Sequence, residues 1–439
     1  MRKTLIASFI TGVCLSLNAH SADLLQIYQE ALANDPVYAS ARASQAAGQE
    51  KSTQGRASLL PTVNLTGSSN RVTQELITAA NNPRGDFTTT AYTLSLSQPL
   101  FRWANWEQYQ QGKLQTAVTE AQFAQAQQDL IVRVSQAYFD VLTSQDALAS
   151  VKAQKIAITE QLASAKRNFE VGTATITDTH EAQARYDLSV AQEFAALNDL
   201  EIKRSALQQI IGKPSPDLAI LRAGVKLTLP QPAELDPWVS SAEKQNYNVA
   251  SSELSLEIAK REISRNRAGH LPTLDLVASK AHSTQSAVLT ATGATSTNNN
   301  TVGVQWTIPL FAGFGVDSKV REAIALEDKA RADLDNVRRT AAQGARQAFL
   351  GVNNGMAQVK ALEAAEISSQ SALESNRLGY QVGVRINIDV LNAQQQLFST
   401  RRDLAKARYD TMMSGLKLKA AAGTLKEEDL SMLNGLLVK

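Results

Sequence analysis

The chain has 439 residues, a formal net charge of +2 and only 5% aromatic residues. The near balance of charge argues against nucleic acid as a partner, and the scarcity of aromatic residues suits long helices with small contact residues better than several compact cores. The single cysteine, Cys14, excludes an intrachain disulfide.

Residues 1–22 are predicted to be a secretory signal peptide. Arg2 and Lys3 form a basic start, an apolar stretch follows up to Leu17, and small residues suited to cleavage lie around Ala19 to Ala22. A membrane anchor is the alternative, but the apolar run is short for a span of about 20 residues. No later segment has that apolar length, so any crossing of a membrane would have to use strands.

The rest of the chain contains one unit twice. "LLPTVNL" from Leu59 matches "HLPTLDL" from His270, an offset of 211 (270 − 59), and the corners at Gly172 and Gly383 match at the same offset (383 − 172). A constant offset over such a length indicates a tandem duplication. We therefore predict repeats at 23–212 and 235–423, a Pro-rich linker at 213–234 and a C-terminal tail at 424–439.

Both repeats are predicted to contain the same elements in the same order. These are a first helix (23–58 and 235–269), a strand pair (61–98 and 272–309), a long helix (104–168 and 315–378), a corner, and a shorter helix (177–211 and 387–422). Neither long helix contains proline, and at 1.5 Å per residue each makes a rod of about 100 Å. Such rods are too polar for lipid and must stand in water.

Small and apolar positions in the second long helix follow an 11-residue pattern, with steps of 3, 4 and 4 residues. Eleven residues in three turns is close to the natural helix period, which favours a nearly straight helical wall. An ordinary two-helix coiled coil remains the alternative. The positions are Leu334, Val337, Ala341, Ala345, Ala348, Val352, Met356 and Val359.

The predicted strands alternate between apolar and polar residues, which is typical of a strand with two different faces. At about 8 to 11 residues each strand is long enough to cross a bilayer at a tilt. We therefore expect one apolar row in each repeat to face lipid. The rows are Tyr92, Leu94 and Leu96 in the first repeat, and Val302, Val304, Trp306 and Ile308 in the second.

Four strands are too few to close a sheet in lipid, where every backbone polar group must be paired. Several copies must then pool their strands: two would give eight strands, and three would give twelve and room for a lumen. The residues by themselves do not choose between these numbers, although transport favours the larger. A soluble four-stranded sheet packed on a helix is the competing interpretation.

The duplicated "LPT…PLF" strand pairs, the paired corners with "VG", and the ending "AAAGTLKEEDL" resemble the TolC family of outer-membrane efflux and type I secretion channels. The resemblance covers nearly the whole chain after residue 22. It implies a mainly α fold with a membrane β-barrel: a homotrimer whose twelve strands form one barrel in outer-membrane lipid, with long coiled α-helices as an α-barrel in the periplasm. It also implies docking to a periplasmic adaptor (a membrane fusion protein) and an inner-membrane ABC, RND or MFS transporter.

The resemblance further implies that the corners form a gate at the periplasmic tip, with Gly172 and Gly383 making the turns. Asp389 would point into the constriction, where three copies would form a ring of carboxylates. Helix capping is the alternative role for Asp178 and Asp389, and a solvated surface charge is the alternative for Arg385. The residues implied in the latch of the closed state are Tyr380, Arg385, Gln161, Thr177 and Asp178.

One position departs from the family pattern, which often carries a second acidic residue three places after the first. That place is Asn392 here, and its repeat mate is Glu181 (392 − 211). The constriction is therefore expected to have either one acidic ring or a second ring drawn from Glu181.

Enzyme motifs are missing from the sequence. The four histidines form no ligand-spaced set, and neither G-x-S-x-G nor H-E-x-x-H occurs. We predict no catalytic, metal or cofactor site. The competing function is a periplasmic coiled-coil adaptor or scaffold protein, which would share the signal peptide and long helices but would not need duplicated amphipathic strand pairs.

Overall fold

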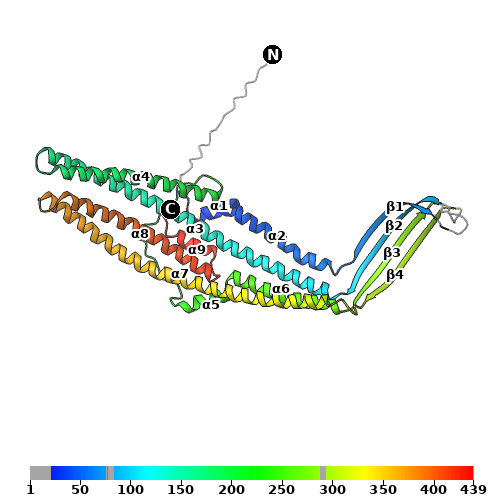
Figure 1. Cartoon of the computed structure of the whole chain (residues 1–439). Helices are drawn as coiled ribbons and strands as arrows, with labels where there is room; N and C mark the ends of the chain where they lie inside the picture. Colours follow the sequence, from blue (N-terminus) through cyan, green and yellow to red (C-terminus); the bar gives the residue numbers. More distant parts are fainter. Residues whose placement is uncertain (1–20, 76, 78–83, 223, 287–292, 439) are drawn as a thin grey trace, which may run out of the picture.

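The computed structural model describes residues 21–75, 77, 84–222, 224–286 and 293–438. The molecule is elongated, with a four-stranded sheet at one end and helices along the rest of its length (Figure 1). Apart from its last two residues, the predicted signal peptide lies outside the described ranges. Ala22 is buried in the folded body and pairs with Leu218 in a β-bridge.

The order of elements repeats along the chain. The first copy contains α1 (Leu24–Asn34), α2 (Pro36–Ala57), β1 (Thr62–Glu75), β2 (Arg84–Phe101), α3 (Trp103–Glu170) and α4 (Ile176–Ile211). The second contains α5 (Leu235–Gln245), α6 (Tyr247–Arg267), the short 3-10 helix η1 (Ala268–His270), β3 (Thr273–Gln285), β4 (Thr295–Thr307), α7 (Gly315–Gln381) and α8 (Asn387–Ala421). The tail adds α9 (Glu427–Asn434).

The first helix of each repeat, predicted as continuous, is divided in two. Asp35 has an extended backbone, accepts a hydrogen bond from the Tyr38 amide at 2.8 Å, and precedes Pro36 at the first position of α2. Asn246 takes the same place before α6, with its side chain accepting from Asn248 N at 2.9 Å. A side-chain cap in an extended conformation starts a new helix, so the chain changes direction there.

The strands are longer than predicted, with 14 and 18 residues in β1 and β2 and 13 each in β3 and β4. Pro99, which follows the strand pair predicted at 61–98, lies inside β2, and the register with β3 shifts between Pro99 and Phe101. This bulge accommodates the missing proline N–H. Ile308 follows the last residue of β4.

All neighbouring strands are antiparallel in the order β1-β2-β3-β4, so the β2–β3 pairing joins the two repeats. Residues directly opposite each other share a face. Val63, Leu96, Ala278 and Val302 form one continuous row across the four strands, and most of the other predicted lipid-facing residues lie on the same face. We call this the apolar face.

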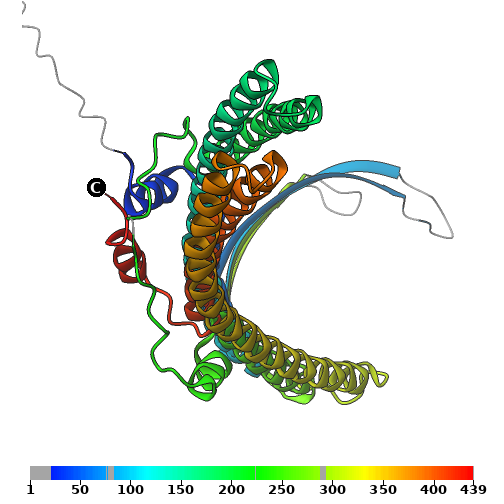
Figure 2. The ribbon, with the colours of Figure 1, turned by 90° about the vertical axis from the view of Figure 1, so that its left-hand side faces the viewer.

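The long helices α3 and α7 contain 68 and 67 residues, about 100 Å each. Seen along the long axis, the helices form a curved wall with α1 and α9 on its convex side (Figure 2). Within the described ranges, none of the helices combines the length and apolarity that a transmembrane helix needs. The main core lies where α1, α3, α4, α8 and α9 meet, and its largest fully buried side chains include Leu24, Ile27, Leu130, Tyr138, Leu142, Leu207 and Leu437.

A polar contact joins the two repeats inside this core. Tyr409 of α8 stacks on Phe139 of α3, with ring centroids 5.6 Å apart, and its hydroxyl donates to Asp146 Oδ2 at 2.8 Å. Burial raises the pKa of the Asp146 carboxyl, and the hydrogen bond from Tyr409 partly offsets that shift. Because the pKa of Asp146 is raised in the folded state, the protonated carboxyl favours folding at low pH. This contribution to stability is lost as the pH rises through the folded-state pKa of Asp146.

We predict that Tyr409→Phe destabilises the protein by about 1–2 kcal/mol at neutral pH, because the buried carboxylate loses a donor. The loss should shrink toward about pH 4, where protonation of Asp146 removes the charge that the hydroxyl stabilises. Thermal unfolding in detergent at both pH values measures the effect. Tyr247→Phe is the control, since its hydroxyl forms no hydrogen bond within the described part of the chain. An equal loss at both pH values would contradict this account.

Candidate functional site at the helical tip

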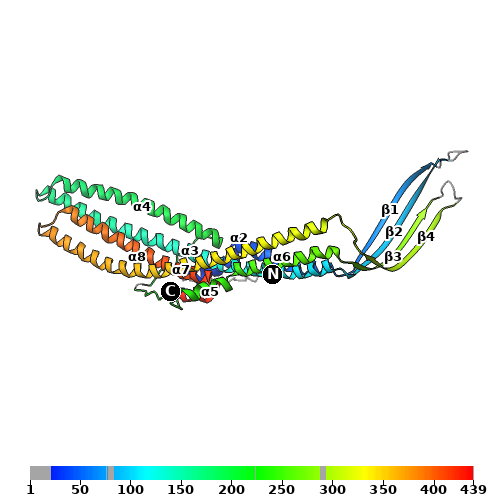
Figure 3. The ribbon, with the colours of Figure 1, turned by 60° about the horizontal axis from the view of Figure 1, so that its bottom comes forward.

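The end of the molecule farthest from the sheet consists of two helical hairpins, α3–α4 and α7–α8, lying side by side (Figures 1 and 3). Each hairpin turns at a glycine in the left-handed region, Gly172 with φ 81° and Gly383 with φ 82°. Other residue types rarely adopt this conformation, which explains a glycine at both corners. The two turns are therefore equivalent products of the duplication.

The helices that leave the two corners begin differently. In α4, Thr175 and Asp178 form a capping box, and the Asp178 carboxylate accepts from Thr175 N at 3.0 Å and from Thr175 Oγ1 at 2.8 Å. In α8 no side chain caps the first turn, and Asp389 is half-buried there. Capping therefore occupies the carboxylate of Asp178, whereas the carboxylate of Asp389 is free for another contact.

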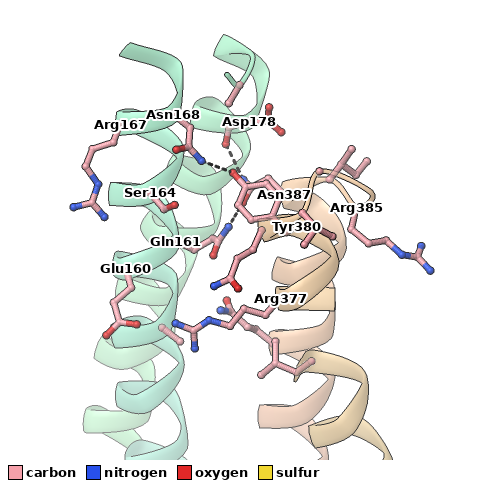
Figure 4. Close-up of a pocket in the computed structure, with 18 of the residues that line it drawn as sticks. Glu160, Gln161, Ser164, Arg167, Asn168, Asp178, Arg377, Tyr380, Arg385 and Asn387 are labelled. Atoms are coloured by element: carbon pink, nitrogen blue, oxygen red, sulfur yellow. Dashed lines mark hydrogen bonds between the residues drawn. The ribbon is translucent and has the colours of Figure 1, made fainter. Parts of the chain in front are cut away.

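Three of the side-chain hydrogen bonds that connect the hairpins lie close to the corners (Figure 4). Gln161 Nε2 of α3 donates to Asn387 Oδ1 at 2.5 Å, and Asn387 Nδ2 donates to the Asp178 carbonyl at 3.1 Å. Farther toward the corner, Asn168 Nδ2 donates to the Tyr380 hydroxyl at 3.2 Å. Asn387 is fully buried, so loss of either partner leaves a buried polar group unpaired. Asn387 is thus the central polar link between the repeats.

Apolar contacts support these links from the next turns of the helices. Leu391 of α8 packs into a small buried cluster formed by residues of α3 and α4. Together the apolar cluster and the hydrogen bonds hold α8 against the first hairpin. The other buried members of the cluster are Ile158, Leu162, Ala165 and Ala182.

Arg385 does not take part in this connection. Its side chain is 59% exposed, its Nη1 lies 3.7 Å from Asp389 Oδ2 in the same corner, and it points away from Gln161 and Asp178 in Figure 4. Thr177 is also exposed and has no side-chain partner among the described residues. Of the expected latch residues, Gln161 bonds to Asn387 and Tyr380 bonds to Asn168 across the hairpins. Asp178 contributes only its carbonyl oxygen to this connection.

Asn392 is tied to the first hairpin. Arg185 of α4 donates to Asn392 Oδ1 at 2.9 Å and also to Gln395 Oε1. Glu181 is partly exposed, one turn before Arg185 on α4, and forms no ion pair within the described ranges. Asn392, at the place where the family pattern often carries a second acidic residue, is therefore a neutral hydrogen-bond acceptor for Arg185.

A groove of about 1060 Å³ lies between the two hairpins. Its lining includes side chains of both charges, among them Glu160 and Arg167 of α3 and Arg377 of α7. Polar and charged side chains from both hairpins therefore line the groove.

Three residues that connect the hairpins were not predicted from the sequence: Asn387, Asn168 and Arg185. For Asn387 a signal was present, because its repeat mate is Ile176 (387 − 211), and a buried polar residue replaces an apolar one at the start of the helix. For Asn168 and Arg185 no signal was available, because both are ordinary residues of polar helices. Their partners lie more than 200 positions away along the chain.

The fold is that of solved outer-membrane channels. Solved structures of similar shape include VceC from Vibrio cholerae, with a TM-score of 0.78 at 19% identity over 91% of this chain and 96% of that chain. The CmeC outer membrane channel of Campylobacter jejuni has a TM-score of 0.79 at 18% identity and covers 100% of this chain and 98% of that chain. At such low identities these likenesses show the fold.

The sequence places the chain within a family. The family described as "Outer membrane efflux protein" matches residues 27–213 and again 238–424, an offset of 211 (238 − 27). The proteases secretion protein PrtF of Dickeya chrysanthemi is 35% identical over 96% of this chain and 93% of its own length. The outer membrane protein TolC of Escherichia coli K12 is 33% identical over 97% of this chain and 88% of its own length.

The chain belongs to the outer membrane efflux protein family. It is an export channel protein of the outer membrane, with a helical barrel and β-strands. The predicted family, fold class and location are confirmed, and the channel interpretation is favoured over a periplasmic adaptor.

We predict that Asn387→Ala loosens the contact between the hairpins and raises the conductance of the reconstituted channel. The substitution leaves the Gln161 amide without its partner and removes the bond to the Asp178 carbonyl, a cost of about 1–3 kcal/mol to the joined state. Arg385→Ser should change conductance little, because its ion pair is exposed and lies within its own corner, where it contributes about 0–1 kcal/mol.

Single-channel recording in planar bilayers measures both changes. Asn376→Ala is the matched control, because the Asn376 side chain donates to the Ala372 carbonyl of its own helix. Equal conductance in Asn387→Ala and Asn376→Ala would contradict the role of Asn387.

Proposed function

We propose that three copies of this chain form one export duct that crosses the outer membrane through a closed twelve-stranded sheet and continues into the periplasm as a helical tunnel. The proposal is supported by the two edges of the sheet, β1 and β4, which have no partner strand within the described chain. In lipid these edges must be paired, and the four strands of one chain are too few to pair them by closure.

The apolar face would be in contact with lipid. Exposed side chains on it include Leu65, Tyr92, Leu94, Val304 and Trp306. An exposed apolar band of this kind is costly in water and favourable in a bilayer. Ile308, just beyond β4, would continue the band toward the helices.

The duct would receive cargo from an inner-membrane transporter of the ABC, RND or MFS class through a periplasmic adaptor. Two relatives, PrtF and the alkaline protease secretion protein AprF of Pseudomonas aeruginosa, are named for the secretion of proteases. Their names favour secreted proteins as the cargo of this chain. The family description favours efflux more generally.

The helical tip would be the gate, and the observation that carries this proposal is the buried Asn387 bridge between the hairpins. A gate needs an element with two states separated by only a few kcal/mol. A few hydrogen bonds and one small apolar cluster provide a connection of that strength. The open state would separate α7–α8 from α3–α4 and transfer these polar groups to water.

Asp389 would form a ring of three carboxylates in the closed tip, each partly balanced by its own Arg385 at 3.7 Å. Asn392, bonded to Arg185, would add no charge of its own. The constriction would then hold one acidic ring, and Glu181 would stay outside it on α4. Such a ring attracts multivalent cations, which would bind in the constriction and reduce the current.

We predict that Asp389→Asn weakens block by a trivalent cation such as hexamminecobalt at least about tenfold, because the ring loses its three charges. The measurement is the concentration dependence of block in planar bilayers. Asp410→Asn removes a carboxylate from the same helix, where it pairs with Lys406, and should leave block unchanged. Unchanged block in Asp389→Asn would contradict the proposed ring of Asp389 carboxylates.

The number of copies can be measured separately. We predict that the protein purified in detergent has the mass of three chains and precipitates or aggregates when the detergent is removed, because the apolar face is then exposed to water. Native mass spectrometry determines the number directly. A monodisperse monomer that stays soluble without detergent would contradict the proposed duct.

A further inference from the structure

The two faces of the sheet differ in charge as well as in apolarity. Opposite the apolar face lies a second face rich in Thr, Ser, Asn and Gln, which we call the hydroxyl face. Its cross-strand rows are Thr66–Thr93–Ala281–Asn299, Asn64–Ser95–Ser279–Thr301, Thr62–Ser97–Val277–Gly303, Ser68–Ala91–Ser283–Thr297 and Asn70–Thr89–Gln285–Thr295.

The structure describes every residue of the four strands, and nearly all of their charged residues lie on the apolar face. Four of them lie beyond the apolar rows by register, toward the end of the sheet away from the helices: Arg71, Glu75, Arg84 and Asp86. The fifth, Lys280, lies within the apolar rows, directly opposite Leu94. Asp275 is the single charged strand residue on the hydroxyl face. With the exception of Asp275, the hydroxyl face of the strands therefore carries no charged residue.

That exception is neutralised. Asp275 is only 6% exposed, and Arg102, which follows β2, donates from Nε to Oδ1 at 2.8 Å and from Nη2 to Oδ2 at 2.5 Å. A bidentate pair of this kind cancels the charge within the protein. Asp275 therefore leaves the hydroxyl face without a free charge.

The exposure of the strands indicates which face is concave. Along β2, Tyr92 and Leu94 on the apolar face are exposed, whereas Thr93 and Ser95 on the hydroxyl face are partly covered. In β3, Lys280 and Thr284 on the apolar face are likewise the exposed positions. The sheet curves toward the same side as the helical wall (Figure 2). The hydroxyl face is the concave face, which becomes the inner face when such a sheet closes.

We infer that the section of the duct within the outer membrane is electrically neutral and lined by hydroxyl and amide groups. This inference rests on the proposed closure of the sheet by three copies. Hydroxyl and amide groups donate and accept hydrogen bonds without preferring either sign of charge. This section therefore takes polar cargo of either charge, including extended polypeptide segments, and selection by charge is confined to the helical part.

The test places single charges on either face by cysteine modification. In a Cys14→Ser background, Thr301→Cys puts a thiol on the hydroxyl face and Val302→Cys puts one on the apolar face at the next residue. Each purified channel is treated with an anionic or a cationic methanethiosulfonate reagent. The K⁺/Cl⁻ permeability ratio is then obtained from the reversal potential in a KCl gradient across a planar bilayer.

For Thr301→Cys we expect the anionic reagent to raise the ratio at least about twofold and the cationic reagent to lower it by a similar factor, because no resident charge masks either one. Val302→Cys should not respond to either reagent. If only one of the two reagents changes the ratio of Thr301→Cys, the face carries resident charge and the inference is overturned. It is also overturned if Val302→Cys responds and Thr301→Cys does not, because the apolar face would then line the lumen. Failure of the proposed duct can be distinguished from failure of this inference, since without a duct the unmodified protein would show no KCl conductance.

Discussion

The pairing of β2 with β3 is the interaction on which the rest of the molecule depends. It joins two copies of one unit into a single antiparallel sheet, so the long helices α3 and α7 follow β2 and β4 of the same sheet. Because α3 and α7 have almost the same length, the α3–α4 and α7–α8 hairpins turn at the same level. Two equivalent corners then meet about 100 Å from the sheet.

Duplication made the corners alike, and later divergence gave them different tasks. The first copy uses Thr175 and Asp178 to cap its own helix, which makes that corner locally stable. The second has no such side-chain cap and places Asn387 where the first has Ile176. The side chain of Asn387 therefore bonds to the other hairpin, and the stability of the second corner depends on a contact that can be broken.

Much of this organisation could be predicted from the sequence. The repeat, the two long helices, the strand pairs with their apolar rows, and the glycine turns all leave local patterns, because each depends on residues close together along the chain. The breaks at Asp35 and Asn246 were missed because one capping residue interrupts an otherwise helical composition. The expected contact of Arg385 with the first hairpin is absent from the structure because Asp389, one turn away, is the nearer partner.

The elements and their duplication can be predicted from local sequence, since periodicity, glycine turns and proline positions act over a few residues. The contacts at the tip and the pairing of residues across the strands depend on the tertiary fold. Hydrogen bonds such as Gln161 to Asn387 join positions more than 200 residues apart. Their formation depends on the strand register and on the lengths of two helices together, which no local pattern records.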